Sequence, residues 1–228
     1  MFVSIWLIGY VPGCYLYWQP WLGRRAGIVM QQIYTIGHSS QSMEAFIAQL
    51  LRHDVEVVAD VRSQPYSARF PHFSREPALA SLKAAGIRYV FLGRELGARR
   101  EEPECYVDGR AVYDRIAKLP AFAAGIERVL AGAQSYRVAL MCAEADPLTC
   151  HRTILVCHEL KKYPLSITHI RHDGALEDHA QAERRLVEEE LGSPEQADMF
   201  VTAHGFQEIL EQAYARRAGN IAYRQHER

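Results

Sequence analysis

A short stretch in the middle of the chain gathers residue types that carry chemistry. It holds two thiols, a carboxylate, an imidazole and a guanidinium, at Cys142, Cys150, Glu144, His151 and Arg152. A thiol near positive charge ionises to a nucleophile, and two thiols with an imidazole can bind a transition metal. The stretch therefore predicts a reactive centre and leaves its mechanism open.

Three mechanisms suit these residue types. In the first, Cys142 or Cys150 is a thiolate nucleophile. The positive groups expected to stabilise this thiolate are Arg62, Arg152 and a protonated His38. In the second, Cys142, Cys150 and His151 bind a metal ion, for which zinc is the possible cofactor. In the third, arginines and backbone amides hold a phosphate while Asp60 or Glu144 acts as acid or base.

Structural signals flank this stretch on both sides. Arg137 to Met141 is an apolar run typical of a strand. Asp146 followed by Pro147 is typical of a helix start, and we predict a helix from Pro147 to about Lys161. Its dipole would favour a thiolate in the first turn. Adjacent residues of a helix point about 100° apart, which disfavours binding of one ion by both Cys150 and His151.

Other predicted strands also end in polar residues. Gln31 to Gly37 leads into His38 and Ser39, and Val55 to Val61 leads into Arg62 and Ser63. Ligands bind beyond the carboxyl ends of parallel strands, so these residues should share one edge with Cys142. We assign the catalytic candidates as Cys142, Glu144, Cys150, His151, His38 and Asp60. We assign the anion-binding candidates as Arg62, Ser63, Arg69, Arg152 and Ser39.

Strands alternate with helices along the chain. Further strands are expected at Ile87 to Leu92 and Ser166 to Ile170, and helices at 43–51, 77–85 and 113–133, the last with a break at Pro120. This order predicts an α/β fold with an open, mostly parallel sheet, Rossmann-like or flavodoxin-like, with helices on both faces. A C-terminal helical tail should follow.

We divide the chain into three parts. Residues 1–29 form an N-terminal extension, 30–175 the α/β core domain, and 176–228 a C-terminal helical acidic tail. The tail should hold helices at 176–191 and 194–217, with a solvated charged surface. The extension is broken by prolines and too short in its apolar part to span a membrane, so we expect either a start site near Met30 or a hydrophobic arm.

Charge and composition indicate the partner and the compartment. The net charge is −1, yet Arg62 to Arg100 carries eight basic residues against two acidic ones. The loop from Pro65 to Phe73 interleaves aromatic residues with Arg69 and His72, which suits a nucleobase and its phosphate. Five cysteines without a Cys-x-x-Cys pair argue for a reducing compartment, so we expect a cytoplasmic protein with no membrane partner.

We therefore expect an enzyme acting on a phosphate-bearing substrate, a nucleotide or a nucleic acid. The alternative is a non-catalytic nucleic-acid or nucleotide-binding module. Several candidates also have plain structural alternatives. Cys142 and Cys150 can be buried hydrophobes, as we expect of Cys157, and Asp60 and Arg62 can form a structural ion pair.

Four motifs together resemble one bacterial family. They are Thr35-Ile36-Gly37-His38-Ser39, Asp60-Val61-Arg62-Ser63 with Pro65 and Ser67, Gly86-Ile87-Arg88-Tyr89, and Met141-Cys142-Ala143-Glu144 followed by Cys150-His151-Arg152. The family is catalogued as domain of unknown function 488, and the resemblance covers about residues 31–162. Leu96-Gly97-Ala98 departs from its usual Leu-Gly-Gly. The resemblance implies a cytoplasmic α/β domain, suspected of being an enzyme because of its cysteines, and names no activity.

Overall fold

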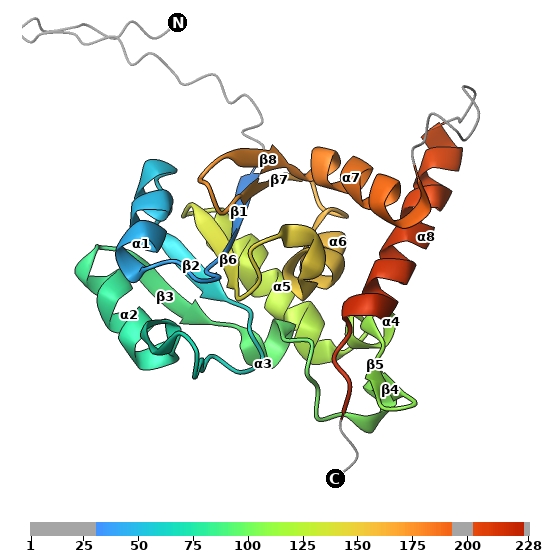
Figure 1. Ribbon diagram of the computed structural model, residues 1–228, viewed down its shortest axis with the longest axis horizontal. Helices are drawn as coiled ribbons and strands as arrows, with labels where there is room; N and C mark the ends of the chain where they lie inside the picture. Colours follow the sequence, from blue (N-terminus) through green and yellow to red (C-terminus); the bar gives the residue numbers. More distant parts are fainter. Residues whose placement is uncertain (1–30, 193–202, 226–228) are drawn as a thin grey trace, which may run out of the picture.

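A six-stranded sheet forms the centre of the protein (Figure 1). The computed structural model describes residues 31–192 and 203–225, so the prediction for residues 1–29 lies outside the described residues. Five strands are parallel and the last is antiparallel, which confirms the expected open α/β sheet. The strands are β1 (Gln31–Gly37), β2 (Val57–Asp60), β3 (Arg88–Phe91), β6 (Val138–Cys142), β7 (Leu165–Ile170) and β8 (Leu176–Asp178).

The strand order determines where the site lies. It is β3-β2-β6-β1-β7-β8, so β6 lies between β1 and β2. This order differs from the Rossmann and flavodoxin orders, although the doubly wound layering is the same. Gly37 is paired with Cys142, and Asp60 with Met141, in the register of these strands. The polar residues that follow the three strands therefore meet at one edge.

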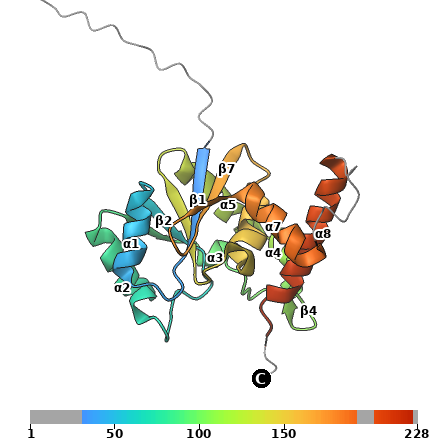
Figure 2. The same cartoon turned by 45° about the horizontal axis from the view of Figure 1, so that its top comes forward.

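Helices cover both faces of the sheet, as predicted (Figure 2). Tyr34 and Ile36 of β1 pack on one face against Phe46 and Leu82, whereas Ile33 belongs to the core on the opposite face. The first face carries α1 (Met43–Arg52) and α2 (Arg75–Ala84). The second carries α3 (Gly93–Leu96), α4 (Tyr113–Ile116), α5 (Pro120–Ala133), α6 (His158–Leu160), α7 (His179–Leu191) and α8 (Ala203–Ile221).

Local sequence signals explain most of the helix boundaries. The Ser42 side chain accepts a hydrogen bond from the Ala45 amide and caps α1. Pro120 occupies the first turn of α5, and α4 ends before it, so the predicted break is present. Between β3 and α4 lie α3, a short 3-10 helix, η2 (Pro103–Cys105), and a hairpin of β4 (Tyr106–Val107) with β5 (Arg110–Ala111). None of the described helices is long and apolar enough to cross a membrane.

The predicted helix at 147–161 is wrong in its first half. Asp146 does act as an N-cap, because its carboxylate accepts from the Leu148 amide at 2.9 Å. The helix it starts is only the 3-10 turn η3 (Pro147–Thr149), after which Cys150 is extended, with φ −133° and ψ 140°. A π-helix, η4 (Arg152–Cys157), then leads into α6. Wide turns of this kind are frequent at functional sites.

The predicted acidic tail is part of the sheet and the core. Leu176 to Asp178 form β8, which pairs with β7 where we expected a helix. Asp178 and Gln181 then make a capping box, so α7 begins only at His179. Side chains of α7 and α8 share the core beneath β6, among them Ala182, Leu186, Leu210 and Tyr214. The second predicted helix, 194–217, corresponds to α8 as far as residues 203–217, and its first part lies outside the described residues.

Several acidic residues of this region are not the solvated surface that we expected. Glu177 pairs with Arg185, and Glu183 with Lys161 at 2.9 Å. Glu190 pairs with Arg217 of α8. These carboxylates are only 11–15% exposed; the three pairs tie α7 to β8, to the segment after α6 and to α8, and leave the carboxylates little room for an outside partner.

Candidate functional site

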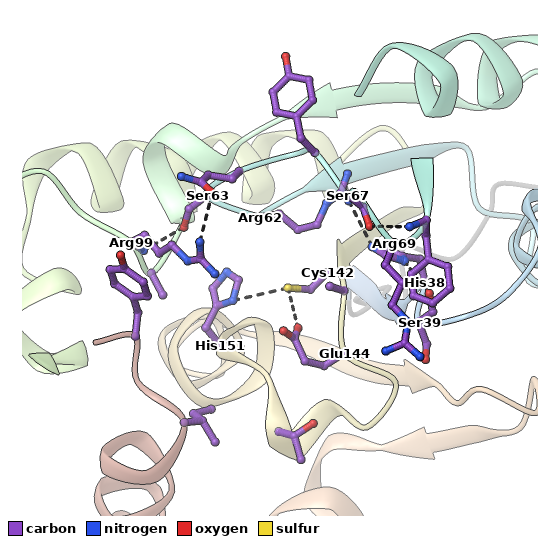
Figure 3. Close-up of a pocket in the computed structure, with 18 of the residues that line it drawn as sticks. His38, Ser39, Arg62, Ser63, Ser67, Arg69, Arg99, Cys142, Glu144 and His151 are labelled. Atoms are coloured by element: carbon purple, nitrogen blue, oxygen red, sulfur yellow. Dashed lines mark hydrogen bonds between the residues drawn. The ribbon is translucent and has the colours of Figure 1, made fainter. Parts of the chain in front are cut away.

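A cavity of about 510 Å³ opens at the carboxyl edge of the sheet (Figure 3). Its floor is formed by the residues that follow β1, β2 and β6. Its walls come from the loop after β2, the segment around Arg99, the start of α4 and the end of α8. The candidate residues on its lining are His38, Ser39, Arg62, Ser63, Arg69, Cys142, Glu144 and His151. Strand topology has therefore brought most of the predicted site into one place.

Cys142 lies at the centre of this floor, between Glu144 and His151 (Figure 3). It is the last residue of β6 and is only 3% exposed. Its thiol donates to Glu144 Oε2 at 3.1 Å, and its Sγ lies 3.6 Å from His151 Nδ1. A carboxylate and an imidazole on one thiol can take and return its proton. Cys142 is thus the sulfur with both a proton path and access to the cavity.

A backbone carbonyl orients His151. Nε2 of its ring lies 3.0 Å from the Val61 carbonyl oxygen, which can only accept. Nε2 therefore carries the hydrogen, and the neutral ring presents the lone pair of Nδ1 to the sulfur of Cys142. Val61 follows β2, so the neighbouring strand sets the tautomer of a residue from the β6 loop.

Cys150 lies behind Cys142 and His151 as seen from the cavity. Its extended backbone turns its side chain toward His151. Its Sγ is 4.0 Å from His151 Nδ1 and accepts from the Arg152 amide at 3.4 Å. Our prediction that Cys150 and His151 point apart is wrong, because the helix on which it depended begins only after them. The ligand atoms of Cys142, Cys150 and His151 all lie within 4.8 Å of one another.

The pKa values of the two buried thiols shift in opposite directions. Burial opposes ionisation of both and raises the pKa of Cys142. At Cys150 burial opposes ionisation, but the interaction with Cys142 and the charge of Arg152 outweigh it, so the pKa of Cys150 is lowered. The resulting thiolate outweighs burial at His151 and raises its pKa. Burial, followed by the Cys150 charge, raises the pKa of Glu144.

Arg152 has a structural role in place of the predicted anion-binding role. Its side chain is fully buried and donates to the carbonyls of Glu144, at 2.6 Å, and Ala145, at 3.1 Å. It therefore fixes the loop that carries Glu144. Gly37 allows this packing, because a Cβ atom there would overlap the Glu144 carbonyl.

Asp60 and Arg62 form a buried ion pair. Arg62 Nη2 lies 2.6 Å from Asp60 Oδ2, and the Tyr89 hydroxyl donates to the same oxygen at 2.6 Å. Asp60 is fully buried and does not line the cavity, so the structure places it behind the site and not among groups that touch a ligand. Arg62 uses four of its five N–H donors on Asp60, His38 and the Phe73 carbonyl, and keeps one for a ligand.

His38 is neutral, not the cation that we expected beside the thiols. Its Nδ1 donates to the Ser39 carbonyl at 3.0 Å, and its Nε2 accepts from Arg62. Burial and the charge of Arg62 lower its pKa to about 4. Ser39, with φ 45°, is held in the left-handed region, and its amide donates to the Ala143 carbonyl at 2.8 Å. These contacts join the ends of β1 and β6.

Two arginines of the cavity wall have no carboxylate partner among the described residues. They are Arg69, which lies over Phe70, and Arg99, which lies over Tyr223. The Arg99 amide donates to Ser63 Oγ at 2.9 Å, so Ser63 holds this part of the wall as an acceptor. Sequence reasoning missed Arg99, Tyr113 and Tyr223 as cavity residues, whereas Tyr66 belongs to the aromatic loop that it placed near the pocket. Arg99 stood out only as part of the basic segment, and Tyr223 gave no signal because α8 brings it to the site.

One family model, described as Domain of unknown function DUF488, matches residues 42–158. The match covers just over half of the chain and includes Asp60, Arg62, Cys142, Glu144 and Cys150. The motif at Thr35 to Ser39 precedes it. No curated protein and no solved structure matches the chain. Because the model spans more than half of its length, the chain belongs to the family of domain of unknown function DUF488.

Proposed function

We propose that this protein is a thiol-dependent enzyme that acts on a phosphate-bearing substrate, a nucleotide or a nucleic acid. The observation that carries the proposal is the position of Cys142. Its sulfur lies on the cavity floor within hydrogen-bonding reach of Glu144 and 3.6 Å from His151. A buried thiol with two proton-accepting neighbours and an open face suits nucleophilic attack better than core packing.

The proposed step begins with transfer of the Cys142 proton to Glu144 or His151. The sulfur forms a bond to an electrophilic centre of the substrate while the bond from that centre to the leaving group breaks. The residue that took the proton returns it to the departing atom; His151 can do so because its Nδ1 faces the sulfur and the Val61 carbonyl holds its Nε2. Arg62 and Asp60 are positioning residues, which hold His38 and the end of β2 in place.

Charge on the cavity wall supports a phosphate. Arg69 and Arg99 are exposed or half-buried cations without a described carboxylate partner, and Arg62 keeps one free donor. Arginine forks match phosphate oxygens in geometry and charge. Tyr66, which is 63% exposed, Phe70 and Tyr223 add aromatic faces on which a base can stack. A free, ionisable thiol also fits the reducing cytoplasm, where we propose that the protein acts.

The test measures binding and thiol protection together. Inorganic phosphate, nucleoside monophosphates and a short single-stranded oligonucleotide are titrated at low and high salt, and Cys142 alkylation is followed with each ligand. We expect at least one ligand to slow alkylation, with an affinity that falls as salt rises. The Arg69→Ala/Arg99→Ala variant should lose about tenfold or more in affinity.

A matched control removes the same charge elsewhere. Arg88 and Arg137 lie at the start of β3 and just before β6, at the opposite edge of the sheet. The Arg88→Ala/Arg137→Ala variant should bind as the unchanged protein does. If both double variants lost affinity equally, the ligand would be binding to positive charge anywhere on the surface and not specifically to the cavity. Salt-sensitive binding without any chemical turnover would favour the non-catalytic binding module.

A further inference from the structure

The second thiol of the site has no role in the proposed reaction. Cys150 is 1% exposed and does not line the cavity, so it cannot meet a substrate directly. It is nevertheless held close to two reactive groups, and its backbone leaves helical geometry to reach them. Two thiols and an imidazole whose ligand atoms all lie within 4.8 Å of one another form a set of side chains that transition metals bind.

The spacing of the three side chains matches a tetrahedral metal. Zinc bonds of roughly 2.3 Å to sulfur and 2.0 Å to nitrogen place a sulfur and a nitrogen ligand about 3.6 Å apart. The Cys142 Sγ to His151 Nδ1 distance is 3.6 Å, and the Cys150 Sγ to His151 Nδ1 distance is 4.0 Å. The two sulfurs lie within 4.8 Å of each other, whereas two zinc–sulfur bonds of roughly 2.3 Å place them about 3.8 Å apart, so an ion would fit with shifts of at most about 1 Å.

The surroundings of the ligands are arranged as around a metal. The Nε2–H group of His151 donates a hydrogen bond to the Val61 carbonyl, which leaves Nδ1 free to bind a metal ion. Metal-bound histidines almost always make such an outer hydrogen bond. The Cys150 sulfur accepts from the Arg152 amide, as a coordinated thiolate would. Two thiolates and one imidazole are soft ligands that select zinc over magnesium or calcium.

We propose that Cys142, Cys150 and His151 bind one Zn²⁺ ion, with the fourth coordination position facing the cavity beside Glu144. Cys142, His151 and Glu144 all line the cavity, whereas Cys150 closes the site from behind. Glu144 Oε2, 3.1 Å from the Cys142 sulfur, is close enough to reach the fourth position directly or through water.

The ion would control the proposed thiol chemistry. A thiolate bound to zinc gives one lone pair and part of its negative charge to the metal, so it should attack a substrate more slowly than the free thiolate does. Zinc-bound and metal-free protein are therefore alternative states of the same centre, and removal of the ion releases the nucleophile. This consequence rests on the proposed function, but the metal site itself does not.

The experiment uses the full chain, purified without added metal and analysed for metal content. The chain is then stripped with a chelator, checked by circular dichroism, and titrated with Zn²⁺ against a chromophoric chelator. We expect one ion per chain. Co²⁺ should give a thiolate-to-metal absorption band whose intensity corresponds to two thiolate ligands.

Variants assign the ligands. Cys142→Ser, Cys150→Ser and His151→Gln should each weaken zinc binding by about 100-fold or more, since a lost ligand costs more than a lost outer partner. Cys157→Ser is the matched control, because Cys157 is a fully buried thiol at the end of η4, the helical segment that follows His151. It should bind zinc as the unchanged protein does. Failure of the folded, stripped protein to bind zinc, or equal zinc affinity in Cys150→Ser and unchanged protein, would overturn the metal site.

Alkylation of the stripped protein separates this inference from the proposed function. Fast alkylation of Cys142 without any zinc binding would reject the metal site and leave the thiol enzyme intact. Zinc binding combined with a stripped Cys142 that reacts no faster than Cys157 would support the metal site and reject the thiol enzyme. Zinc binding that blocks a fast Cys142 supports both.

Discussion

Two polar clusters lie within the interior of this protein, and they differ in what surrounds them. The open cluster consists of Cys142, Glu144, Cys150 and His151 at the end of β6. The closed cluster joins β1, β7, α7 and α8 through Thr35, His169, His179, Tyr214 and Glu183. Both bury histidines, yet no member of the closed cluster lines the cavity beside Cys142.

The closed cluster uses its polar groups on one another. Thr35 Oγ1 lies 2.7 Å from His169 Nδ1, and His169 Nε2 lies 3.0 Å from His179 Nδ1. The Tyr214 hydroxyl completes the chain with a 2.9 Å bond to Glu183. Burial lowers the pKa of both histidines, to about 4 for His179. Both rings therefore stay neutral and serve as packing groups with satisfied hydrogen bonds.

In the open cluster the pKa of His151 shifts in the opposite direction. The ring is almost as well enclosed, but the Cys150 thiolate outweighs burial and raises its pKa. The comparison shows that burial of a histidine does not by itself indicate a site. The distinguishing features are an ionisable sulfur at one ring nitrogen, a backbone carbonyl at the other, and a cavity beside them.

The largest expected difference between the clusters is in thiol reactivity. In metal-free protein at neutral pH, iodoacetamide should modify Cys142 about 100-fold faster than Cys157, because only Cys142 combines access with proton acceptors. His151→Gln should slow Cys142 by about tenfold, since the base facing the sulfur is lost. Peptide mass spectrometry gives the rate for each residue. Equal rates in folded protein would remove the distinction between the clusters.

The second prediction concerns stability and should show the reverse pattern. His169 is fully buried between Thr35 and His179, so His169→Ala leaves a cavity and unpaired polar groups. We expect a loss of about 2–4 kcal/mol in the free energy of unfolding, measured in urea. The Cys142 alkylation rate should stay within about twofold of its original value. A large fall in that rate would mean that the two clusters are coupled.

The third prediction follows from the lowered pKa of His179. Below pH 6.5 the unfolded chain takes up a proton at this residue, whereas the folded chain does so only near pH 4. The free energy of unfolding should therefore decrease as the pH is lowered from 6.5 to 4, and this group should contribute up to roughly 3 kcal/mol of the decrease. His179→Phe should flatten the pH dependence of unfolding over this range. An unchanged slope would place the acid sensitivity in other groups, first of all His169, which lies 3.0 Å from His179 and whose pKa is also lowered by burial.

The open cluster could be predicted from sequence because its residues follow strands. Each of β1, β2 and β6 is a short apolar run with polar residues immediately after it, and parallel strands place such residues together. The order of the strands was not predictable, because the apolar runs look alike and their pairing depends on contacts distant in sequence. The Cys150 direction was missed because Asp146-Pro147 signals a helix start and says nothing of its length.

The closed cluster gave no signal in the sequence. His169 lies in the middle of a strand and His179 at the start of a helix, and nothing local shows that they meet. The same holds for β8, where pairing with the free edge of β7 overrides the helical pattern of Leu176 to Leu191. Tyr223 reaches the cavity only because α8 crosses the site. Contacts of this kind are set by tertiary packing, which short sequence patterns do not encode.

The smallest expected effect concerns the ion pair that joins the loop of the open cluster to α7. Asp146 caps η3 beside Cys150 and is held by Arg185 of α7 through two contacts of 2.9 and 3.0 Å. Arg185→Met removes this brace but keeps much of the side-chain volume. Both partners are partly exposed, so we expect a loss of only about 1 kcal/mol in unfolding free energy.

Its effect on the site should also be small and in a defined direction. Arg152 still holds the Glu144 and Ala145 carbonyls in this variant, so the loop keeps its inner support. Cys142 alkylation should therefore slow by less than about tenfold, which is less than for His151→Gln. Arg184→Met is the control, because Arg184 is the neighbouring arginine of α7 and bonds only the Ala180 carbonyl of its own helix among the described residues. Arg185→Met could instead slow Cys142 alkylation as much as His151→Gln does. The geometry of the thiol would then depend on a contact made outside the cavity, and α7 would be part of the open cluster.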